Sequence, residues 1–139
     1  MKSLLNITPR YQETDKMGII HHSVYPIWYE AGRVKFCEDI KLPFDQIESL
    51  GLYQALIDLK VHYIKSARFN EPLIQTTFIK SMTKLKLTFG YQIHNQAGEL
   101  INEGETMLVW LNHDLKPINL AKHHKEVYDQ LLKSYEEEA

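Results

Sequence analysis

The chain has 139 residues, with 16 basic and 18 acidic side chains, so its net charge at pH 7 is −2. Its length predicts one domain with a real hydrophobic core. A near-neutral balance excludes general attraction to nucleic acid or to an anionic membrane, so a phosphate-bearing partner would need a local basic patch. With 44% hydrophobic and 24% charged residues, the composition is that of a soluble globular protein.

Cys37 is the only cysteine, which excludes an internal disulfide and the usual cysteine-based zinc sites. The first residues, Met1 to Ile7, lack the apolar stretch of a signal peptide, and no run of about 18 apolar residues occurs. We therefore expect a cytoplasmic protein with no membrane insertion.

In chain order, the pattern predicts a strand over Leu4 to Arg10, an irregular loop over Gln12 to Ser23, and then a long helix. Pro26 suits the first turn of this helix, and Ser23 is placed to cap it. Large or close-packing residues recur at helical spacing at Tyr25, Trp28, Tyr29, Gly32, Phe36 and Ile40. Charged residues of the same helix are expected to point away from that face, at Glu30, Arg33, Lys35 and Glu38.

After a short helix predicted over Phe44 to Leu50, the hydrophobic period changes from helical to alternating, which indicates strands. Residues 85–93 alternate strictly, and Asn95 to Gly98 supplies a turn into a return strand. The remaining predicted strands are Ala55 to Ala67, Pro72 to Met82 and Leu100 to Asn112, and a last helix begins near His123.

One long early helix followed by four antiparallel strands indicates an α+β fold, in which an antiparallel β-sheet wraps around the helix. We expect a single domain over residues 1–139, of which about 121–139 form an extra C-terminal helical extension. Such a sheet leaves an edge strand free.

The loop before the long helix places a carboxylate, Asp15, and a histidine, His22, close to a helix start. Unpaired N–H groups and the positive dipole end at a helix start favour the meeting of an acidic side chain and a polarised carbonyl. This chemistry needs neither a metal nor a bound cofactor, and we predict none.

The order of residues in this region, an aromatic at Tyr11, then Thr14-Asp15-x-x-Gly18-Ile19-Ile20, then His22-x-x-Tyr25, is also informative. It resembles the hotdog-fold acyl-CoA thioesterases of the 4-hydroxybenzoyl-CoA thioesterase type, especially their bacterial YbgC-like branch. The resemblance covers about the first 120 residues. It implies the hotdog fold, acyl-CoA as the substrate, and a homodimer or homotetramer.

By this resemblance Asp15 is the catalytic carboxylate, acting as general base for water or as nucleophile, and His22 assists it. The alternative for Asp15 is that its side chain only caps a turn. Gly18 and Ile19 are expected to contact substrate, Gly18 through a closely approaching N–H or by adopting a positive φ. Tyr25 is expected to be a packed residue whose hydroxyl lies near the site.

His21 is expected to line the pocket. The two adjacent histidines are expected to point apart, and no cysteine or carboxylate cluster completes a metal-binding set. Val24 stands where close relatives often have asparagine, so a hydrogen bond which that residue makes in them is missing here.

A second patch, Val61 to Glu71, resembles the family's strand that ends in Lys/Arg-Pro-Ala-Arg, with Ser66 in place of the proline. The resemblance implies that Lys65 and Arg68 bind the CoA phosphates, for which their charged donors are suited. The alternative is that they are ordinary charges at the end of a strand.

We therefore predict an acyl-CoA thioesterase that acts on a small-molecule substrate and binds no nucleic acid. Two alternatives remain: a thioesterase of the same fold that acts on acyl carrier protein, and a non-catalytic acyl-CoA-binding module.

Overall fold

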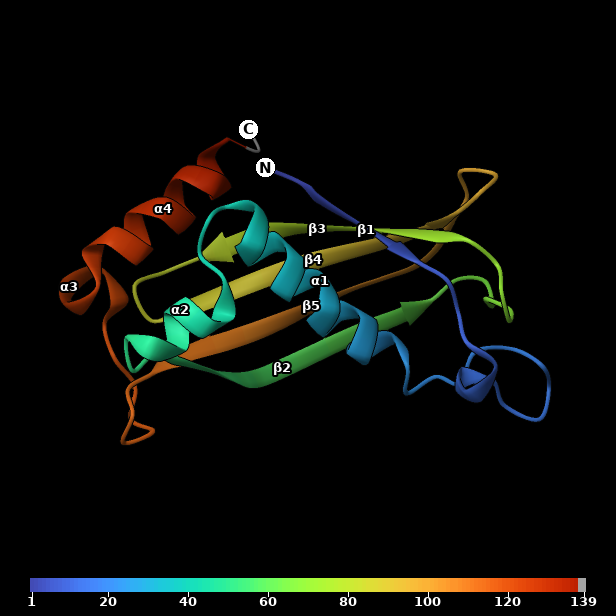
Figure 1. Cartoon of the computed structure of the whole chain (residues 1–139), viewed down its shortest axis with the longest axis horizontal. Helices are drawn as coiled ribbons and strands as arrows, with labels where there is room; N and C mark the ends of the chain where they lie inside the picture. Colours follow the sequence, from blue (N-terminus) through green and yellow to red (C-terminus); the bar gives the residue numbers. More distant parts are fainter. Residues whose placement is uncertain (138–139) are drawn as a thin grey trace.

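The computed structural model describes residues 1–137 and shows a five-stranded antiparallel sheet with one long helix, α1, across one face (Figure 1). The strands are β1 (Ser3–Ile7), β2 (Tyr53–Tyr63), β3 (Leu73–Met82), β4 (Lys86–Asn95) and β5 (Leu100–Leu111). The helices are the 3-10 turn η1 (Tyr11–Glu13), α1 (Tyr25–Asp39), α2 (Phe44–Ser49), α3 (Leu120–His123) and α4 (Lys125–Glu136). The α+β class and the predicted helices and strands are confirmed.

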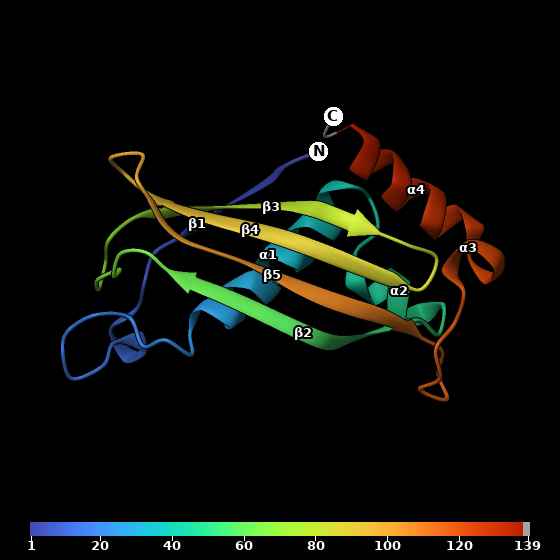
Figure 2. The same cartoon turned by 180° about the vertical axis from the view of Figure 1, so that it is seen from behind.

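The strands are arranged in the order β1-β3-β4-β5-β2, so β2 pairs with β5 and not with its sequence neighbour β3. The β2–β3 connection takes the chain from the β2 edge past β5 and β4 to β3, which lies next to the opposite edge strand β1. Seen from behind, the sheet lies in front of α1, and the face of the sheet that points away from α1 is open (Figure 2). The two edges are β1 and β2.

The core forms between the sheet and the inner side of α1, which buries the predicted aromatic positions. The ring of Tyr29 stacks parallel on that of Tyr91 with centroids 4.3 Å apart, and Phe36 meets Phe89 edge to face at 5.4 Å. Full burial of a large apolar side chain stabilises a fold by about 1.5–3 kcal/mol. These ring contacts fix the position of α1 on β4.

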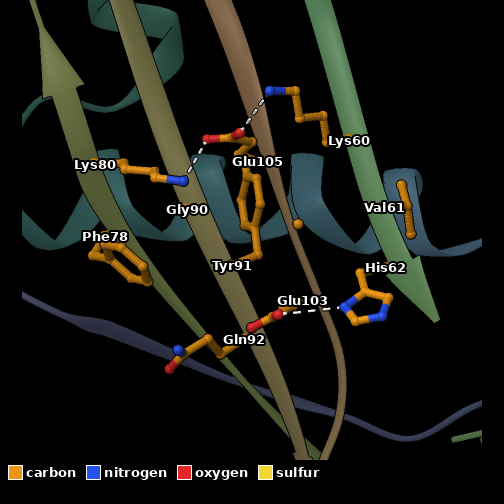
Figure 3. Close-up of a pocket in the computed structure, with 11 residues that line it drawn as sticks. Lys60, Val61, His62, Phe78, Lys80, Gly90, Tyr91, Gln92, Glu103 and Glu105 are labelled. Carbon is orange, nitrogen blue, oxygen red and sulfur yellow. Dashed lines mark hydrogen bonds and ion pairs between the residues drawn. The ribbon is translucent and has the colours of Figure 1, made fainter. Parts of the chain in front are cut away.

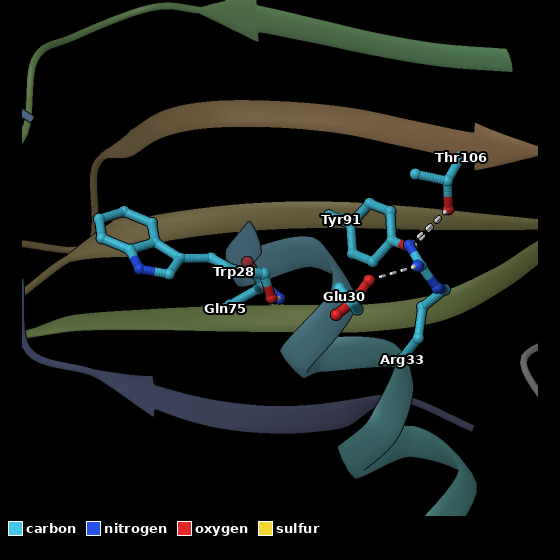
Figure 4. Close-up of polar contacts among 6 residues, drawn as sticks. All are labelled: Trp28, Glu30, Arg33, Gln75, Tyr91 and Thr106. Atoms are coloured by element: carbon cyan, nitrogen blue, oxygen red, sulfur yellow. Dashed lines mark hydrogen bonds and ion pairs between the residues drawn. The ribbon is translucent and has the colours of Figure 1, made fainter. Parts of the chain in front are cut away.

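Gly32 allows α1 to lie unusually close to β3. A Cβ at this position would be 2.2 Å from Gln75 Nε2 and 2.4 Å from Thr77 Oγ1. Gln75 uses the close approach to donate a hydrogen bond of 2.7 Å to the main-chain carbonyl of Trp28 (Figure 4). The sheet is thereby bonded directly to the backbone of the helix.

Arg33 is buried, with 8% of its surface exposed, and the expectation that it points away from the core is wrong. Its Nη1 donates to the hydroxyls of Tyr91 (3.2 Å) and Thr106 (3.4 Å), and its Nη2 lies 3.8 Å from a Glu30 carboxylate oxygen (Figure 4). A buried guanidinium requires such partners, and the hydroxyls on β4 and β5 provide them. The helical spacing of charges alone did not reveal them.

The start of α1 also differs from the prediction. Val24 is the N-cap residue and Pro26 lies in the first turn, but no side chain caps the helix. The Ser23 hydroxyl bonds to the ring of His21 instead, at 2.8 Å.

The predicted C-terminal helix is confirmed as α4, which buries Val127 and Leu131. Gln130 on this helix donates to the main-chain carbonyl of Ile40, just after α1. The assignment of 1–139 to one domain with an extension from about residue 121 stays a prediction, and its last two residues, 138–139, lie outside the described residues.

Candidate active site

The loop that carries Asp15 is a small hairpin closed by backbone hydrogen bonds. Thr14 and Ile20 form an antiparallel bridge, and the Asp15 N–H donates to the Ile19 carbonyl at 2.8 Å. Gly18 lies at the tip with φ +79°, and its N–H donates to the Asp15 carbonyl at 3.1 Å. Of the two expected uses of Gly18, the structure shows the positive-φ turn, with the N–H already bonded.

The Asp15 carboxylate also shapes this turn. Its Oδ1 accepts hydrogen bonds from the N–H groups of Met17 (2.7 Å) and Ile19 (3.4 Å). The turn-capping alternative raised by the sequence is therefore seen, but it involves only one oxygen. Because Oδ2 takes no part in these two bonds, the half-buried carboxylate keeps an oxygen for a water or a substrate.

The hairpin is joined to the segment that follows β2. The Ile20 N–H donates to the Ala67 carbonyl at 2.9 Å, and Ile19 forms an isolated antiparallel bridge with Arg68. The two patches singled out in the sequence, about fifty residues apart, are thus side by side.

Between these segments lies a hollow of about 270 Å³. It contains one carboxylate, one imidazole and one ammonium group among apolar and aromatic side chains. The lining residues are Asp15, Met17, Ile19, Ile20, His22, Tyr25, Tyr63, Ile64, Lys65 and Ser66. Five of the eight predicted site residues therefore meet in one hollow: Asp15, Ile19, His22, Tyr25 and Lys65.

The other three, Gly18, His21 and Arg68, are not part of the lining. His21 turns toward the helix start, where its Nδ1 lies 2.8 Å from the Ser23 hydroxyl and 3.2 Å from the Ser23 nitrogen. The expectation that the two histidines point apart is wrong, because the His21 and His22 rings overlap with centroids 4.1 Å apart.

The N–H groups at the start of α1 are partly used. Ser23 donates to the His21 ring and Val24 donates to the His21 carbonyl at 3.0 Å. The Tyr25 N–H belongs to the first turn of the helix, where no intrahelical acceptor exists. Of these three amides it is the one that makes neither of these bonds, and Tyr25 lines the hollow of Asp15.

Tyr63, at the end of β2, was not singled out in the sequence. Its hydroxyl donates to the His22 carbonyl at 2.8 Å, and its ring meets that of Tyr25 edge to face at 5.4 Å. Burial raises the pKa of both tyrosines, although a backbone hydrogen bond at Ala67 opposes the rise at Tyr25. Both phenols stay protonated at neutral pH. In the sequence, the one signal that pointed to Tyr63 was its position two residues before Lys65, at the end of a predicted strand.

The two expected phosphate ligands differ. The Lys65 ammonium forms an ion pair with Glu99, whose pKa is lowered by this hydrogen bond. Arg68 is exposed, and among residues 1–137 its guanidinium has no ion pair. Arg68 is therefore the freer of the two cations, whereas a phosphate on Lys65 would compete with Glu99.

A metal-dependent mechanism and a cysteine nucleophile find less support in the part of the chain that the structure describes. No group of three or more His, Cys, Asp and Glu side chains there is arranged to hold a metal ion. Cys37 is fully buried, and burial raises the pKa of its thiol to about 12, so it is no nucleophile at neutral pH.

A second hollow, of about 340 Å³, lies on the open face of the sheet (Figure 3). Glu105 accepts there from Lys80 at 2.9 Å and lies 3.4 Å from Lys60, while His62 lies 3.4 Å from Glu103. Its charges are paired with one another, and it contains no residue of the Asp15 loop. It does not contribute to the site.

Comparison with known proteins agrees with this picture. The thioesterase-like superfamily model matches residues 9–131. YneP of Bacillus subtilis (strain 168), named as an acyl-CoA thioesterase, is 32% identical over 117 residues, which cover 84% of this chain and 85% of YneP. The acyl-CoA thioester hydrolase YbgC of Escherichia coli O157:H7 is 27% identical over 113 residues, 81% of this chain and 84% of YbgC.

Among solved structures, a DHNA-CoA thioesterase from Staphylococcus aureus superimposes with a TM-score of 0.91 at 32% identity. The match covers 95% of this chain and 89% of that protein. The predicted hotdog fold and the predicted thioester hydrolase are confirmed. The chain belongs to the thioesterase-like superfamily of hotdog-fold enzymes that hydrolyse thioesters.

Proposed function

We propose that this thioesterase hydrolyses acyl-CoA in the hollow that contains Asp15 and His22. The observation that carries the proposal is that a half-buried carboxylate, with one oxygen outside its turn, and an imidazole line the same hollow, which has apolar walls. An acyl group needs the apolar walls, and hydrolysis needs the base or nucleophile. The reaction requires no cofactor besides the CoA of the substrate.

In the proposed reaction, the Asp15 carboxylate removes a proton from water as the water oxygen attacks the thioester carbonyl, or it attacks the carbonyl itself. The negative charge that develops on the carbonyl oxygen is stabilised by the Tyr25 N–H at the start of α1. When water attacks, the C–S bond then breaks, CoA leaves as a thiolate that takes up a proton, and the free acid remains. When Asp15 attacks, breakage of the C–S bond releases CoA and leaves an acyl–aspartyl anhydride, which a water then hydrolyses to the free acid and the Asp15 carboxylate. His22 orients the water or donates to the carbonyl.

We further propose that Arg68, supported by Lys65, binds the phosphates of CoA. Arg68 is adjacent to the hollow through its bridge with Ile19, and its guanidinium is exposed. Arg68→Ala should raise KM for an acyl-CoA several-fold more than KM for the same acyl group on N-acetylcysteamine, which lacks the nucleotide. Equal effects on the two thioesters would contradict this role.

The unit of function is proposed to be a homodimer, or a homotetramer built from it, paired through β2. This edge strand exposes a row of apolar side chains, with Leu56 and Ile57 each 50% and Leu59 39% exposed. Antiparallel pairing of two β2 strands would bring the partner's β2 toward Tyr63, which lines the hollow. Sedimentation velocity of wild type and Leu59→Lys tests this, since the variant should be a monomer.

The proposed location is the cytoplasm. No helix in residues 1–137 is long and apolar enough to cross a membrane, and the single buried cysteine is compatible with a reducing compartment.

A panel of short, medium, long and aromatic acyl-CoAs, with matching acyl carrier protein thioesters, tests the substrate proposal through release of free thiol. Preference for the CoA thioesters is the expected result. Preference for the carrier protein would favour the alternative enzyme. Thermal stabilisation by acyl-CoA without any turnover would favour the binding module.

A further inference from the structure

Glu13 carries a buried carboxylate just before the hairpin of Asp15, outside the lining of the hollow. Only 8% of its surface is exposed. Its Oε1 accepts the Arg10 N–H at 2.7 Å, and its Oε2 accepts the indole Nε1–H of Trp28 at 3.2 Å. A carboxylate is costly to bury, and it is found inside a protein only where such donors stabilise its charge.

The backbone of Glu13 is also bonded on both sides. Its N–H donates to the Arg10 carbonyl at 3.0 Å, and its carbonyl accepts the His21 N–H at 2.8 Å. The residue thus binds the segment that enters the hairpin and the segment that leaves it. Asp15 and His22 lie one or two residues beyond these fixed points.

Trp28 extends the connection into the sheet. Its carbonyl accepts the hydrogen bond from Gln75 of β3, shown in Figure 4, while its indole donates to Glu13. One residue of α1 therefore links the sheet to the catalytic loop. The exposed Arg10 guanidinium, 65% exposed and 3.5 Å from Glu13, adds only a weak surface ion pair.

We propose that Glu13 is a positioning residue for the reaction: its bond to the Trp28 indole holds the hairpin in the register that brings Asp15 to the thioester carbonyl. This inference rests on the proposed role of Asp15. Small displacements of a catalytic group lower the rate of the chemical step steeply. The loss should therefore appear in kcat and not in the binding of CoA, which other residues provide.

Two variants cut the same bond from opposite ends. Trp28→Phe removes the indole donor together with part of the ring volume, and Glu13→Gln replaces the charged acceptor by a neutral one that can no longer accept on both sides. Each should lower kcat by roughly tenfold or more with less than about threefold change in KM. Because both remove one interaction, the double variant should lose little more than either single variant.

Two controls separate positioning from general destabilisation. Arg10→Ala removes the exposed ion pair but keeps the Arg10 N–H, and kcat should stay within about twofold of wild type. Val127→Ala, in the remote helix α4, should lower Tm by an amount comparable to Trp28→Phe without changing kcat of the folded protein. All rates are measured at a temperature where each variant is folded by circular dichroism.

Asp15→Asn is measured in the same series. If Asp15→Asn abolishes turnover while folded Trp28→Phe and Glu13→Gln keep the wild-type kcat, the positioning role is overturned. If Glu13→Gln does not fold, the kcat of Trp28→Phe alone decides whether Glu13 has the positioning role. If Asp15→Asn retains full activity, the proposed catalytic role of Asp15 is wrong. The positioning role of Glu13 depends on it and would then be wrong as well.

Discussion

The hydroxyl of Tyr63 donates a 2.8 Å hydrogen bond to the main-chain carbonyl of His22, across 41 residues of sequence. It joins the end of the edge strand β2 to the segment between the Asp15 hairpin and α1. The same tyrosine lines the hollow with Asp15. The position of the His22 imidazole therefore depends on a strand that is itself exposed along one side.

Tyr63→Phe should lower kcat/KM by up to about tenfold, because a single hydrogen bond of this kind contributes about 0.5–1.5 kcal/mol. The phenylalanine keeps the ring contact with Tyr25, so Tm should change little. Steady-state kinetics of Tyr63→Phe and of a control, Tyr128→Phe on α4, provide the measurement. Equal kinetics for both variants and wild type would show that the hydroxyl does not support the site.

Gly32→Ala should destabilise the protein by about 1–3 kcal/mol, even though alanine is the better helix former by about 1 kcal/mol. The added methyl group would meet Gln75 and Thr77 at 2.2 and 2.4 Å and push α1 off β3. Urea unfolding followed by circular dichroism measures the difference. A more stable variant would mean that the two polar side chains can move aside without cost.

The sequence predicted the long helix and the strands well, because the helical spacing of Tyr25, Trp28, Tyr29 and Phe36 and the alternation from Leu87 to Ile93 are local patterns. The strand order was not accessible in this way. The consecutive strands β2 and β3 are separated in the sheet by β5 and β4, and no local periodicity encodes this separation.

For the site, a short motif was enough to bring together Asp15 and His22, which lie in one loop. Tyr63 and Glu13 were missed for two different reasons. Tyr63 reaches the loop only through the fold, from a strand 41 residues away. Glu13 lies in a predicted loop, where the sequence gives no sign of burial, and only its bonds to Trp28 and Arg10 show why it is buried. The orientation of Arg33 was predicted wrongly because its partners lie on strands β4 and β5, far away in the sequence.

The Cys37 thiol should resist alkylation in the native protein. It has no exposed surface, and burial raises its pKa to about 12, so almost no thiolate exists near pH 8. Iodoacetamide labelling followed by mass spectrometry should show reaction only after unfolding in denaturant. Labelling of the folded protein at the rate of a free thiol would mean that α1 separates from the sheet frequently.

The ion pairs of Glu105 on the open face should make stability depend on pH in the acid range. The hydrogen bond from Lys80, the main cause, lowers the pKa of Glu105 below 4.5, although slight burial opposes it. A depressed carboxyl pKa stabilises the fold above the unfolded-state value, and this contribution is lost as pH falls through the lower folded-state value.

The unfolding free energy of wild type should therefore fall more steeply between about pH 5 and pH 3 than that of Lys80→Met, with a difference of about 0.5 kcal/mol for such a surface pair. Lys84→Met, which removes an exposed lysine that has no ion pair in the described chain, is the control and should follow wild type. Identical pH dependence for Lys80→Met and wild type would show that the pair contributes nothing.

The central claim, that Asp15 performs the hydrolysis, is tested most directly by the rate of free CoA release from an accepted acyl-CoA by wild type and by Asp15→Asn. Asparagine can still accept from the Met17 and Ile19 N–H groups, so the turn should persist and circular dichroism should be unchanged. We predict a fall in kcat of at least about 100-fold, the size expected for loss of a general base or nucleophile. A folded Asp15→Asn enzyme that releases CoA at the wild-type rate would contradict the claim and move the chemistry to another residue.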